Sequence, residues 1–356
     1  KRLCRLHECR VGGGIRDIDT ARRWLEAGAR RIVVGTAATP ELLSRLPRER
    51  VVVALDCRRR RVVVDGWRSC TGRDVAARMA ELAPLAGGFL VTVVEREGRL
   101  AGADMELAAE LKKFAGDARL VLAGGISTAR EIAALDEMGI DAQVGLAIYD
   151  GTLELADAVA APLRTDRPDG LWATVVCDEG YRALGLAWSN RQSLSEALRT
   201  RRGVYWSRKR GLWRKGETSG CGQELVRVAL DCDRDALMFV VRQHGRGFCH
   251  LERDGCWGDL RGLAALQKRI AQRFAERPET SYTAKLFDDP GLLEAKLAEE
   301  AQELAAARER DEVTHEAADL LYFAMAKLCQ AGVRLEDVER ELDRRAAFFA
   351  RGGRTP

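Results

Sequence analysis

Three aspartates and a cysteine alternate along one short stretch of the chain, Leu230-Asp231-Cys232-Asp233-Arg234-Asp235. In an extended strand, alternate side chains share a face, so the carboxylates would point to one side and Cys232 to the other. Carboxylate oxygens suit Mg²⁺, whereas a thiolate needs further sulfur or imidazole ligands to hold Zn²⁺. Cys249 and Cys256 are candidates for those ligands. A zinc site with three cysteines leaves one position for a water, whose pKa it lowers to roughly 7.

A solvated loop and small core cysteines would explain any one of these residues taken singly. Asp is depleted in strands, however, so three of them beside a cysteine favour a metal site. Upstream, the segment 205–220 mixes cations, hydroxyls and two tryptophans. Arg, Lys and Ser bind phosphate and tryptophan offers a face to a purine, but a basic β-hairpin explains the same composition. Composition alone leaves both interpretations open.

A second group of acids falls within a helical pattern near the C-terminal end. Leu293, Leu297 and Leu304 form one apolar stripe, and Glu300 occupies a position within that same stripe. The other acids of this group lie at neighbouring helical positions and on the next predicted helix: Glu299, Glu303, Glu316 and Asp319. Carboxylates in an apolar interface need a cation, and oxygens from two facing helices suit Mg²⁺, which would bind a polyphosphate. Solvated surface helices are the alternative.

The elements that position these residues divide into three segments. Short β-branched runs alternate with helical stretches from Glu8 to about Ala161, a pattern of parallel βα units. We count six such units, whereas a closed barrel needs eight. Glycines end two strands and open helices, and backbone amides at such turns bind phosphate, although each turn is also simply a tight connection. The four glycines predicted to contact a ligand with two phosphates are Gly13, Gly14, Gly124 and Gly125.

A polar, proline-bounded linker is predicted at 162–170, followed by a β-rich segment at 171–261 and an all-α segment at 262–356. The β-rich segment includes an expected strand from Glu224 to Asp233. The three helices singled out in the last segment are Leu292 to Arg308, Asp311 to Gln330 and Leu335 to Arg351. The fold class is therefore multidomain: an incomplete (β/α)8-type barrel, a mainly β unit of the α+β class, and an all-α bundle.

Composition narrows the function classes. A hydrophobic fraction of 46% with 31% charged residues is typical of a globular protein, and no apolar run is long enough to span a membrane. Lys and Arg total 58 against 54 Asp and Glu, and the signs are interspersed, which gives no support to a nucleic-acid partner. Ten irregularly spaced cysteines favour a reducing compartment over a disulfide framework. We therefore expect a cytoplasmic protein with phosphorylated small-molecule substrates.

The middle segment resembles phosphoribosyl-AMP cyclohydrolase. The motifs that carry this resemblance are Trp206-Ser207-Arg208, Leu212-Trp213, Lys215-Gly216-Glu217-Thr218-Ser219-Gly220, Asp231-Cys232-Asp233-Arg234-Asp235, and Cys249-His250 through Cys256. The resemblance implies Mg²⁺ on the three aspartates and Zn²⁺ on the three cysteines, with Cys232 supplied by the other subunit of a homodimer. It implies substrate contacts at Trp206, Ser207, Arg208, Trp213, Lys215, Glu217, Thr218 and Ser219.

The implied reaction is hydrolytic opening of a purine ring by a zinc-activated water. His250, beside a ligand cysteine, is our candidate for proton transfer, with a structural role as the alternative. Two positions depart from the family pattern: Lys209 stands where Ser is frequent, and Cys221-Gly222 follows the glycine-rich motif. We interpret Cys221 as an additional thiol, not a ligand.

The last segment resembles the all-α nucleotide pyrophosphohydrolases, through Glu299-Glu300-x-x-Glu303 and Glu316-x-x-Asp319. Ser281 to Leu286 and Ala318 to Tyr322 narrow the resemblance to phosphoribosyl-ATP pyrophosphohydrolase. This implies Mg²⁺ held by Glu300, Glu303, Glu316 and Asp319, with water attacking between the α and β phosphates. Lys285 is a candidate phosphate contact.

The first segment resembles the barrel of phosphoribosyl-formimino imidazole-carboxamide isomerase, from its third to its eighth strand. Asp56 would correspond to the acid of that family's fifth strand, and Thr92 to a polar active-site residue on the sixth. The partner carboxylate lies on a strand that this chain lacks, and Val93 and Glu97 replace usual aspartates. One member of an acid-base pair cannot run the isomerisation. Truncation of an enzyme, suggested by Lys1, and degeneration of the domain both remain open.

These resemblances predict a bifunctional hydrolase of histidine biosynthesis that depends on zinc and magnesium. There are two alternatives, the first within the enzymes and the second outside them. One is a house-cleaning nucleotide pyrophosphohydrolase with a non-catalytic zinc module. The other is a scaffold that binds phosphoribosyl ligands without turnover.

Overall fold

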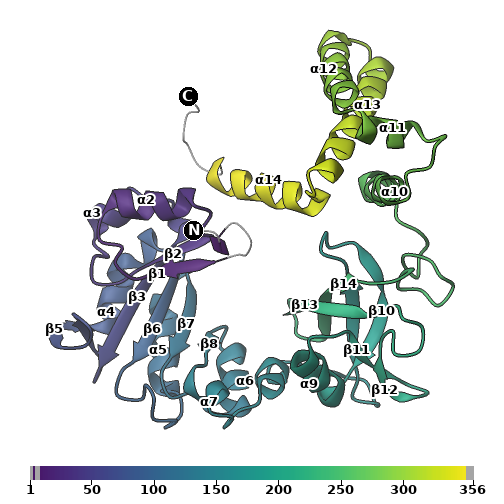
Figure 1. Ribbon diagram of the computed structural model, residues 1–356. Helices are drawn as coiled ribbons and strands as arrows, with labels where there is room; N and C mark the ends of the chain where they lie inside the picture. The colour runs from purple at the N-terminus through teal and green to yellow at the C-terminus, as the bar shows by residue number, and fades with distance from the viewer. Residues whose placement is uncertain (1–2, 5–8, 350–356) are drawn as a thin grey trace.

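A computed structural model of the chain describes residues 3–4 and 9–349. Figure 1 shows three units in these ranges: a sheet covered by helices, a smaller sheet, and a group of helices at the C-terminal end. Each unit has its own cluster of buried side chains. Lys1 and the predicted helix end at Arg351 lie outside the described residues.

The first unit is built on six parallel strands in the order β1-β2-β3-β6-β7-β8. Their bounds are β1 Arg10–Gly12, β2 Arg31–Val34, β3 Val51–Arg58, β6 Gly88–Val93, β7 Arg119–Ala123 and β8 Asp141–Gln143. Two short strands, β4 (Arg61–Val64) and β5 (Ser69–Asp74), extend antiparallel from β3. Within the described residues β1 and β8 are the two edges of an open sheet. The predicted incomplete barrel with six βα units is confirmed.

Helices cover this sheet because their apolar stripes face it. Their bounds are α2 Ile18–Glu26, α3 Pro40–Leu43, α4 Val75–Leu82, α5 Met105–Phe114, α6 Ala129–Glu137, α7 Leu146–Tyr149, α8 Leu155–Ala160, and the 3₁₀ turns Arg48–Arg50 and Ala83–Leu85. In α6, Ile132 and Leu135 are buried and a reciprocal capping box joins Thr128 to Glu131. Gly139, in a left-handed conformation, follows the end of this helix.

The second unit is a four-stranded sheet in the order β10-β9-β14-β13, with a separate β11-β12 hairpin. Its elements are β9 Trp172–Cys177, β10 Ala183–Ser189, α9 Arg191–Thr200, β11 Val204–Ser207, β12 Gly211–Arg214, β13 Gln223–Leu230 and β14 Ala236–Gln243. Its core includes the fully buried Tyr205 and Phe239. Ala156 of α8 also belongs to this core cluster, so α8 packs against the second unit.

One predicted strand is wrong at its end. The strand expected from Glu224 to Asp233 stops at Leu230, and Asp231 to Asp235 form the turn before β14. The Asp231 carboxylate accepts hydrogen bonds from the amides of Asp235 and Ala236 at 3.0 and 3.1 Å, which replaces strand pairing with local capping. Arg234 has a left-handed backbone with φ +68°. The acids are therefore gathered by a turn and not by strand alternation.

The third unit is entirely helical in its described part. Its helices are α10 Gly262–Glu276, α11 Tyr282–Asp288, α12 Pro290–Ala306, α13 Arg310–Gln330 and α14 Leu335–Phe349. The three helices singled out from sequence are present, and α10 and α11 precede them. The core gathers Ile270, Leu286, Leu293 and Phe323. In Figure 1, α14 runs back toward α2, and Arg344 donates a hydrogen bond to the Glu26 carbonyl oxygen at 3.3 Å.

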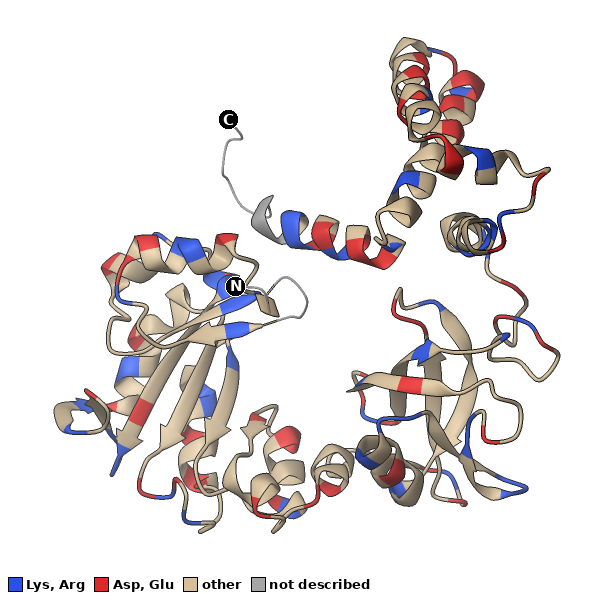
Figure 2. Ribbon diagram, in the orientation of Figure 1, with Lys and Arg blue, Asp and Glu red and all other residues tan. Residues whose placement is uncertain are grey.

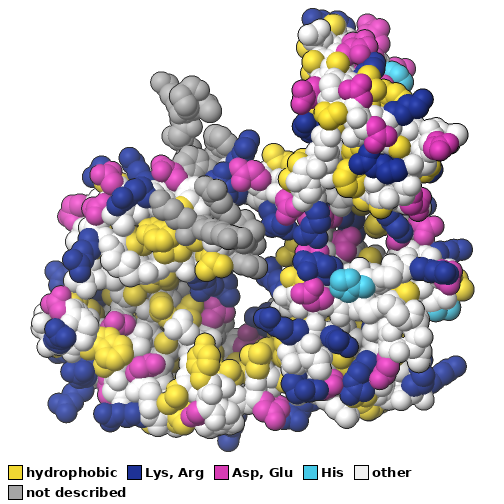
Figure 3. Space-filling view, in the orientation of Figure 1, with side chains coloured by type: hydrophobic (Ala, Val, Ile, Leu, Met, Phe, Trp, Pro, Cys, Tyr) yellow, Lys and Arg dark blue, Asp and Glu magenta, His cyan; other side chains and the backbone are white. Residues whose placement is uncertain are grey.

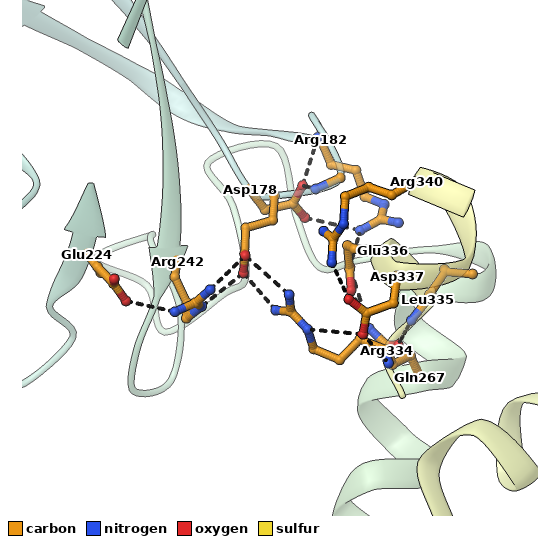
Figure 4. A network of polar contacts seen from close by, with 12 residues as sticks. Asp178, Arg182, Glu224, Arg242, Gln267, Arg334, Leu335, Glu336, Asp337 and Arg340 are labelled. Atoms are coloured by element: carbon orange, nitrogen blue, oxygen red, sulfur yellow. Dashed lines mark hydrogen bonds and ion pairs between the residues drawn. The ribbon is translucent and has the colours of Figure 1, made fainter. Parts of the chain in front are cut away.

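A polar network joins the second and third units (Figure 4). Glu179, in the turn between β9 and β10, pairs with Arg334, which directly precedes α14, at 2.7 Å. Arg242 of β14 pairs with the same carboxylate at 2.8 Å. Arg182 reaches the buried Glu336 at 3.2 Å. The start of α14 is thus attached to the second unit through the turn between β9 and β10, which carries both Glu179 and Arg182.

The surface repeats the mixture of charges seen in the sequence. Figure 3 shows cationic and acidic side chains interspersed over the visible face of the molecule. Among the helices of residues 3–4 and 9–349, none is long and apolar enough to cross a membrane.

Candidate active sites

The acidic turn of the second unit brings its three aspartates together. One carboxylate oxygen from each of Asp231, Asp233 and Asp235 lies within 4.8 Å of the others. Burial opposes ionisation of Asp231, but hydrogen bonds from the Ala236 and Asp235 amides outweigh it and lower the pKa of Asp231. A hydrogen bond with Asp231, and then the charge of Asp233, raise the pKa of Asp235. Three crowded hard oxygens of this kind fit a divalent cation such as Mg²⁺.

Cys249 and Cys256 lie together on the segment that follows β14. The amide of Cys256 donates to the Leu184 carbonyl oxygen at 2.7 Å, which attaches this segment to β10. Burial and then the neighbouring Cys249 raise the pKa of the Cys256 thiol. His250 Nδ1 lies 4.0 Å from Cys249 Sγ, so the candidate proton-transfer group is beside the thiols.

Cys232 is placed with the acids and not with the other two thiols. Its Sγ lies 3.9 Å from Asp233 Oδ1 on the exposed turn. Within residues 3–4 and 9–349 of this single chain, no group of three clustered ligand atoms includes a cysteine. The two thiols of Cys249 and Cys256 provide two of the ligands that a tetrahedral Zn²⁺ site needs, so completion requires a donor from elsewhere.

The β11-β12 hairpin carries several of the residues predicted to contact the substrate. Trp206 lies opposite Leu212 and Ser207 opposite Gly211, so Arg208 occupies the hairpin turn. Arg208 lies over the Trp188 ring at 5.5 Å. Glu217, Thr218 and Ser219 follow in an exposed turn after β12.

Lys215 connects the hairpin with the cysteine segment. Its Nζ lies 5.3 Å from the Phe248 ring and 6.0 Å from the Trp213 ring. Burial lowers the pKa of Lys215, while the nearby Cys221, Cys256 and Cys249 act in the opposite direction. Hydrogen bonding from the Arg246 amide is the largest cause that lowers the pKa of Cys221. The structure therefore places Lys215 among three thiols, a relation that the sequence did not indicate.

The third unit brings acids from α12 and α13 together, where Figure 2 shows acidic segments gathered on both helices. Carboxylate oxygens of Glu300, Glu303 and Glu316 lie within 4.8 Å of one another. Glu300 is only 6% exposed, and burial, followed by the charges of Glu303 and Asp319, raises its pKa. Burial and then Glu303 also raise the pKa of Glu316. This buried cluster of like charges fits a divalent cation.

The remaining predicted residues of this unit lie around the cluster. Asp319 is close enough for its charge to act on Glu300, but it pairs with His315 at 3.4 Å and is outside the clustered group. Lys285 is exposed on α11. Lys296, which the sequence analysis missed, lies 3.8 Å from Glu300 and 2.7 Å from Glu299. Its position one helical turn before Glu300 was the available signal.

In the first unit, Asp56 of β3 accepts a hydrogen bond from Trp67 Nε1 at 2.9 Å and lies opposite Thr92 of β6. A cavity of about 350 Å³ is lined by Asp56 and also by Asp65, a second carboxylate that the sequence analysis did not single out. A smaller cavity of about 50 Å³ is lined by Gly124 and Gly125. Gly13 and Gly14 are exposed and do not line it.

Comparison with known proteins gives three family matches in order along the chain. They are "Histidine biosynthesis protein" over residues 4–154, "Phosphoribosyl-AMP cyclohydrolase" over 185–258 and "Phosphoribosyl-ATP pyrophosphohydrolase" over 263–346. The matches have the same identities and order as the resemblances of the sequence.

Individual relatives are of two kinds. Histidine biosynthesis trifunctional proteins of Neurospora crassa and Komagataella pastoris are 54% identical over 193 residues and 40% identical over 299 residues. These matches cover 54% and 78% of this chain but 22% and 35% of the relatives, so the chain spans a minor part of their length. The histidine biosynthesis bifunctional protein HisIE of Thermus thermophilus is 40% identical over 189 residues, 49% of this chain and 87% of that protein.

Proposed function

Because the chain belongs to the family of histidine biosynthesis bifunctional HisIE proteins, we propose that it catalyses two consecutive hydrolyses. The first releases pyrophosphate from phosphoribosyl-ATP, and the second opens the six-membered purine ring of the resulting phosphoribosyl-AMP. One observation carries the proposal: each of the two segments that match these hydrolase families contains a separate cluster of carboxylates able to hold a cation. We assign the hydrolases to residues 171–261 and 262–356, as α+β and all-α domains joined to the barrel by the linker 162–170.

For pyrophosphate release, Glu300, Glu303 and Glu316 would hold Mg²⁺, with Asp319 beside them. When bound, Mg²⁺ supplies the positive charge that offsets both the carboxylates and the polyphosphate. The burial of Glu300 keeps bulk water from screening its charge, which strengthens its attraction for a cation. Lys285, on the neighbouring helix α11, would contact a phosphate, and water would attack between the α and β phosphates.

For ring opening, Cys249 and Cys256 would hold Zn²⁺ together with Cys232 of a second copy, because Cys232 does not join them within one chain. When bound, zinc supplies Lewis-acid activation of the attacking water. Asp231, Asp233 and Asp235 would hold Mg²⁺.

The side chains around these ligands bind the substrate and move its protons. Trp206 and Trp213 offer faces for the purine, and Lys215 and Arg208 bring positive charge for the phosphate. The remaining proposed substrate contacts are Ser207, Glu217, Thr218 and Ser219. His250 would transfer a proton at the opening ring, a role supported by its position 4.0 Å from Cys249 Sγ.

A shared zinc site requires a homodimer, which we propose as the working state in the cytoplasm. For the barrel unit we propose no isomerase activity. Asp56 retains a cavity, but Gly13 and Gly14 do not line the cavity formed at Gly124 and Gly125, so the four predicted phosphate-binding glycines are not brought together.

The test is turnover of phosphoribosyl-ATP by metal-reconstituted protein, with pyrophosphate and imidazole product followed together. We expect Glu300→Gln to stop pyrophosphate release and Cys249→Ser to let phosphoribosyl-AMP accumulate. Wild-type protein that makes neither product would overturn the proposal. Hydrolysis of noncanonical nucleoside triphosphates in place of phosphoribosyl-ATP would favour the house-cleaning alternative, and binding without turnover at full metal occupancy would favour the scaffold.

A further inference from the structure

The acidic turn of the second unit is attached to the first unit through its one cation, Arg234. The guanidinium of Arg234 donates to the carboxylate of Asp136 on α6, with Nη2 to Oδ1 at 2.8 Å and Nε to Oδ1 at 3.1 Å. The two residues are separated by 98 positions in the sequence. Both side chains are half-buried, at 32% and 21% exposure, so solvent screens this pair less than a fully exposed one.

Arg234 also forms hydrogen bonds with the backbone of the turn and with the linker. Its Nη1 donates to the Asp231 carbonyl oxygen at 2.9 Å, and its own carbonyl oxygen accepts from the Arg164 amide at 2.7 Å. Arg234 keeps a left-handed backbone, which a non-glycine residue adopts only when its surroundings determine it. The contact with Asp136 is one of the interactions that hold Arg234 in this backbone conformation. The backbone that carries Asp233 and Asp235 is therefore fixed on both sides of Arg234 by groups outside the turn.

Helix α6 is a firm support for this contact. Its N-terminus has a complete capping box, its buried face packs Ile132 and Leu135 into the core of the first unit, and Asp136 lies one position before its last residue. Asp136 therefore has a fixed position relative to the parallel sheet. A carboxylate on a loop would not provide the same restraint.

We infer that Asp136 of the barrel unit is a positioning residue for the metal-binding turn of the cyclohydrolase, acting through Arg234. The inference rests on the proposed function, because it takes Asp231, Asp233 and Asp235 as metal ligands. Groups behind the ligands orient them before the metal arrives, and their removal typically weakens metal binding by about 10- to 100-fold. The barrel unit thus contributes to the second hydrolysis without chemistry of its own.

The experiment measures Mn²⁺ binding to the full chain by electron paramagnetic resonance. A Glu300→Gln, Glu303→Gln background removes the acidic cluster of the third unit, so that, among residues 3–4 and 9–349, the turn is the acidic cluster left to report binding. Asp136→Ala is compared with Glu137→Ala, which removes an exposed acid from the same helix. Alanine favours a helix, so both variants keep α6. Asp136→Glu restores the carboxylate.

We expect Asp136→Ala to weaken Mn²⁺ binding by about tenfold, Glu137→Ala to leave it unchanged, and Asp136→Glu to recover part of the loss. With the third unit intact, the cyclohydrolase kcat of Asp136→Ala returns to the wild-type value at saturating Mg²⁺, while half-saturation requires more metal. Equal Mn²⁺ binding by the two alanine variants, or a kcat of Asp136→Ala that Mg²⁺ does not restore, would overturn this inference but not the proposed function. If the background protein itself binds no Mn²⁺ at the turn, the metal role in the proposed function is wrong and the inference falls with it.

Discussion

The carboxylate of Glu179 is predicted to hold the third unit against the second. Two arginines donate four hydrogen bonds to it, with Arg334 at 2.7 and 3.2 Å and Arg242 at 2.8 and 3.0 Å. The Glu179 side chain is 14% exposed. Burial opposes its ionisation, but the two guanidinium groups outweigh burial and lower its pKa from 4.5 to about 2.

The difference between the two pKa values of Glu179 sets the size of the stabilisation that its ion pairs provide. A pKa that falls from 4.5 to about 2 corresponds, at face value, to about 3 kcal/mol of stabilisation of the folded state. Since both guanidinium groups are more than 40% exposed, solvent screening reduces our expectation for Glu179→Gln to about 1–2 kcal/mol. The folded pKa is depressed, so the stabilisation is complete above pH 4.5 and is lost as pH falls toward 2. It is therefore constant between pH 6 and 8.

The assay is amide hydrogen exchange over the first turn of α14, where the Leu335 amide donates to the Gln267 side chain. A loss of about 1–2 kcal/mol corresponds to exchange that is roughly 5- to 30-fold faster in Glu179→Gln. The matched control is Glu224→Gln, because Glu224 is 51% exposed, pairs with the same Arg242 at 2.8 Å, and lies on β13. In Glu224→Gln, amide exchange over the first turn of α14 should change by less than about threefold. Equal effects of the two variants would refute the reasoning that Glu179 joins the units.

Three further predictions concern the candidate metal centres. In EDTA, Glu300→Gln should raise the melting temperature of the third unit, measured by calorimetry. The raised pKa of Glu300 means that its charge destabilises the fold at neutral pH. Added Mg²⁺ should remove the difference in melting temperature between the variant and the wild type. Cys249→Ser should reduce bound zinc to near zero by atomic absorption while pyrophosphate release continues at the wild-type rate, because the two clusters lie in different units. Cys221→Ser should leave zinc content unchanged, and a loss of zinc would contradict its interpretation as an additional thiol.

The strands and helices that depend on hydrophobic periodicity and local chemistry could be predicted from the sequence. Six parallel strands were recognised because buried β-branched runs alternate with capped helices, and α12 and α13 because Glu300 interrupts a leucine stripe. The end of β13 was predicted wrongly because the Asp231 carboxylate captures two amides and ends the ladder at Leu230, a competition that alternation does not report. The helices α10 and α11 were expected only as a general helical pattern.

Contacts between distant parts of the chain could not be predicted in this way. Lys215 lies near Cys221, Cys249 and Cys256 because the segment between β12 and β13 lies beside the segment after β14, and no spacing encodes that arrangement. Asp65 lines the same cavity as Asp56 because β4 and β5 fold back over that cavity, and the sequence pattern does not encode this fold-back.

The relation between the barrel unit and the acidic turn gives a physical reason for the two to stay in one chain. A unit that serves as a support must keep α6 fixed but does not need a closed barrel. Asp136, 98 positions from Arg234, lies on a helix whose cap and buried face are intact. A unit retained as a support should therefore tolerate Asp56→Asn without loss of either hydrolysis, whereas Asp136→Ala should weaken metal binding at the acidic turn.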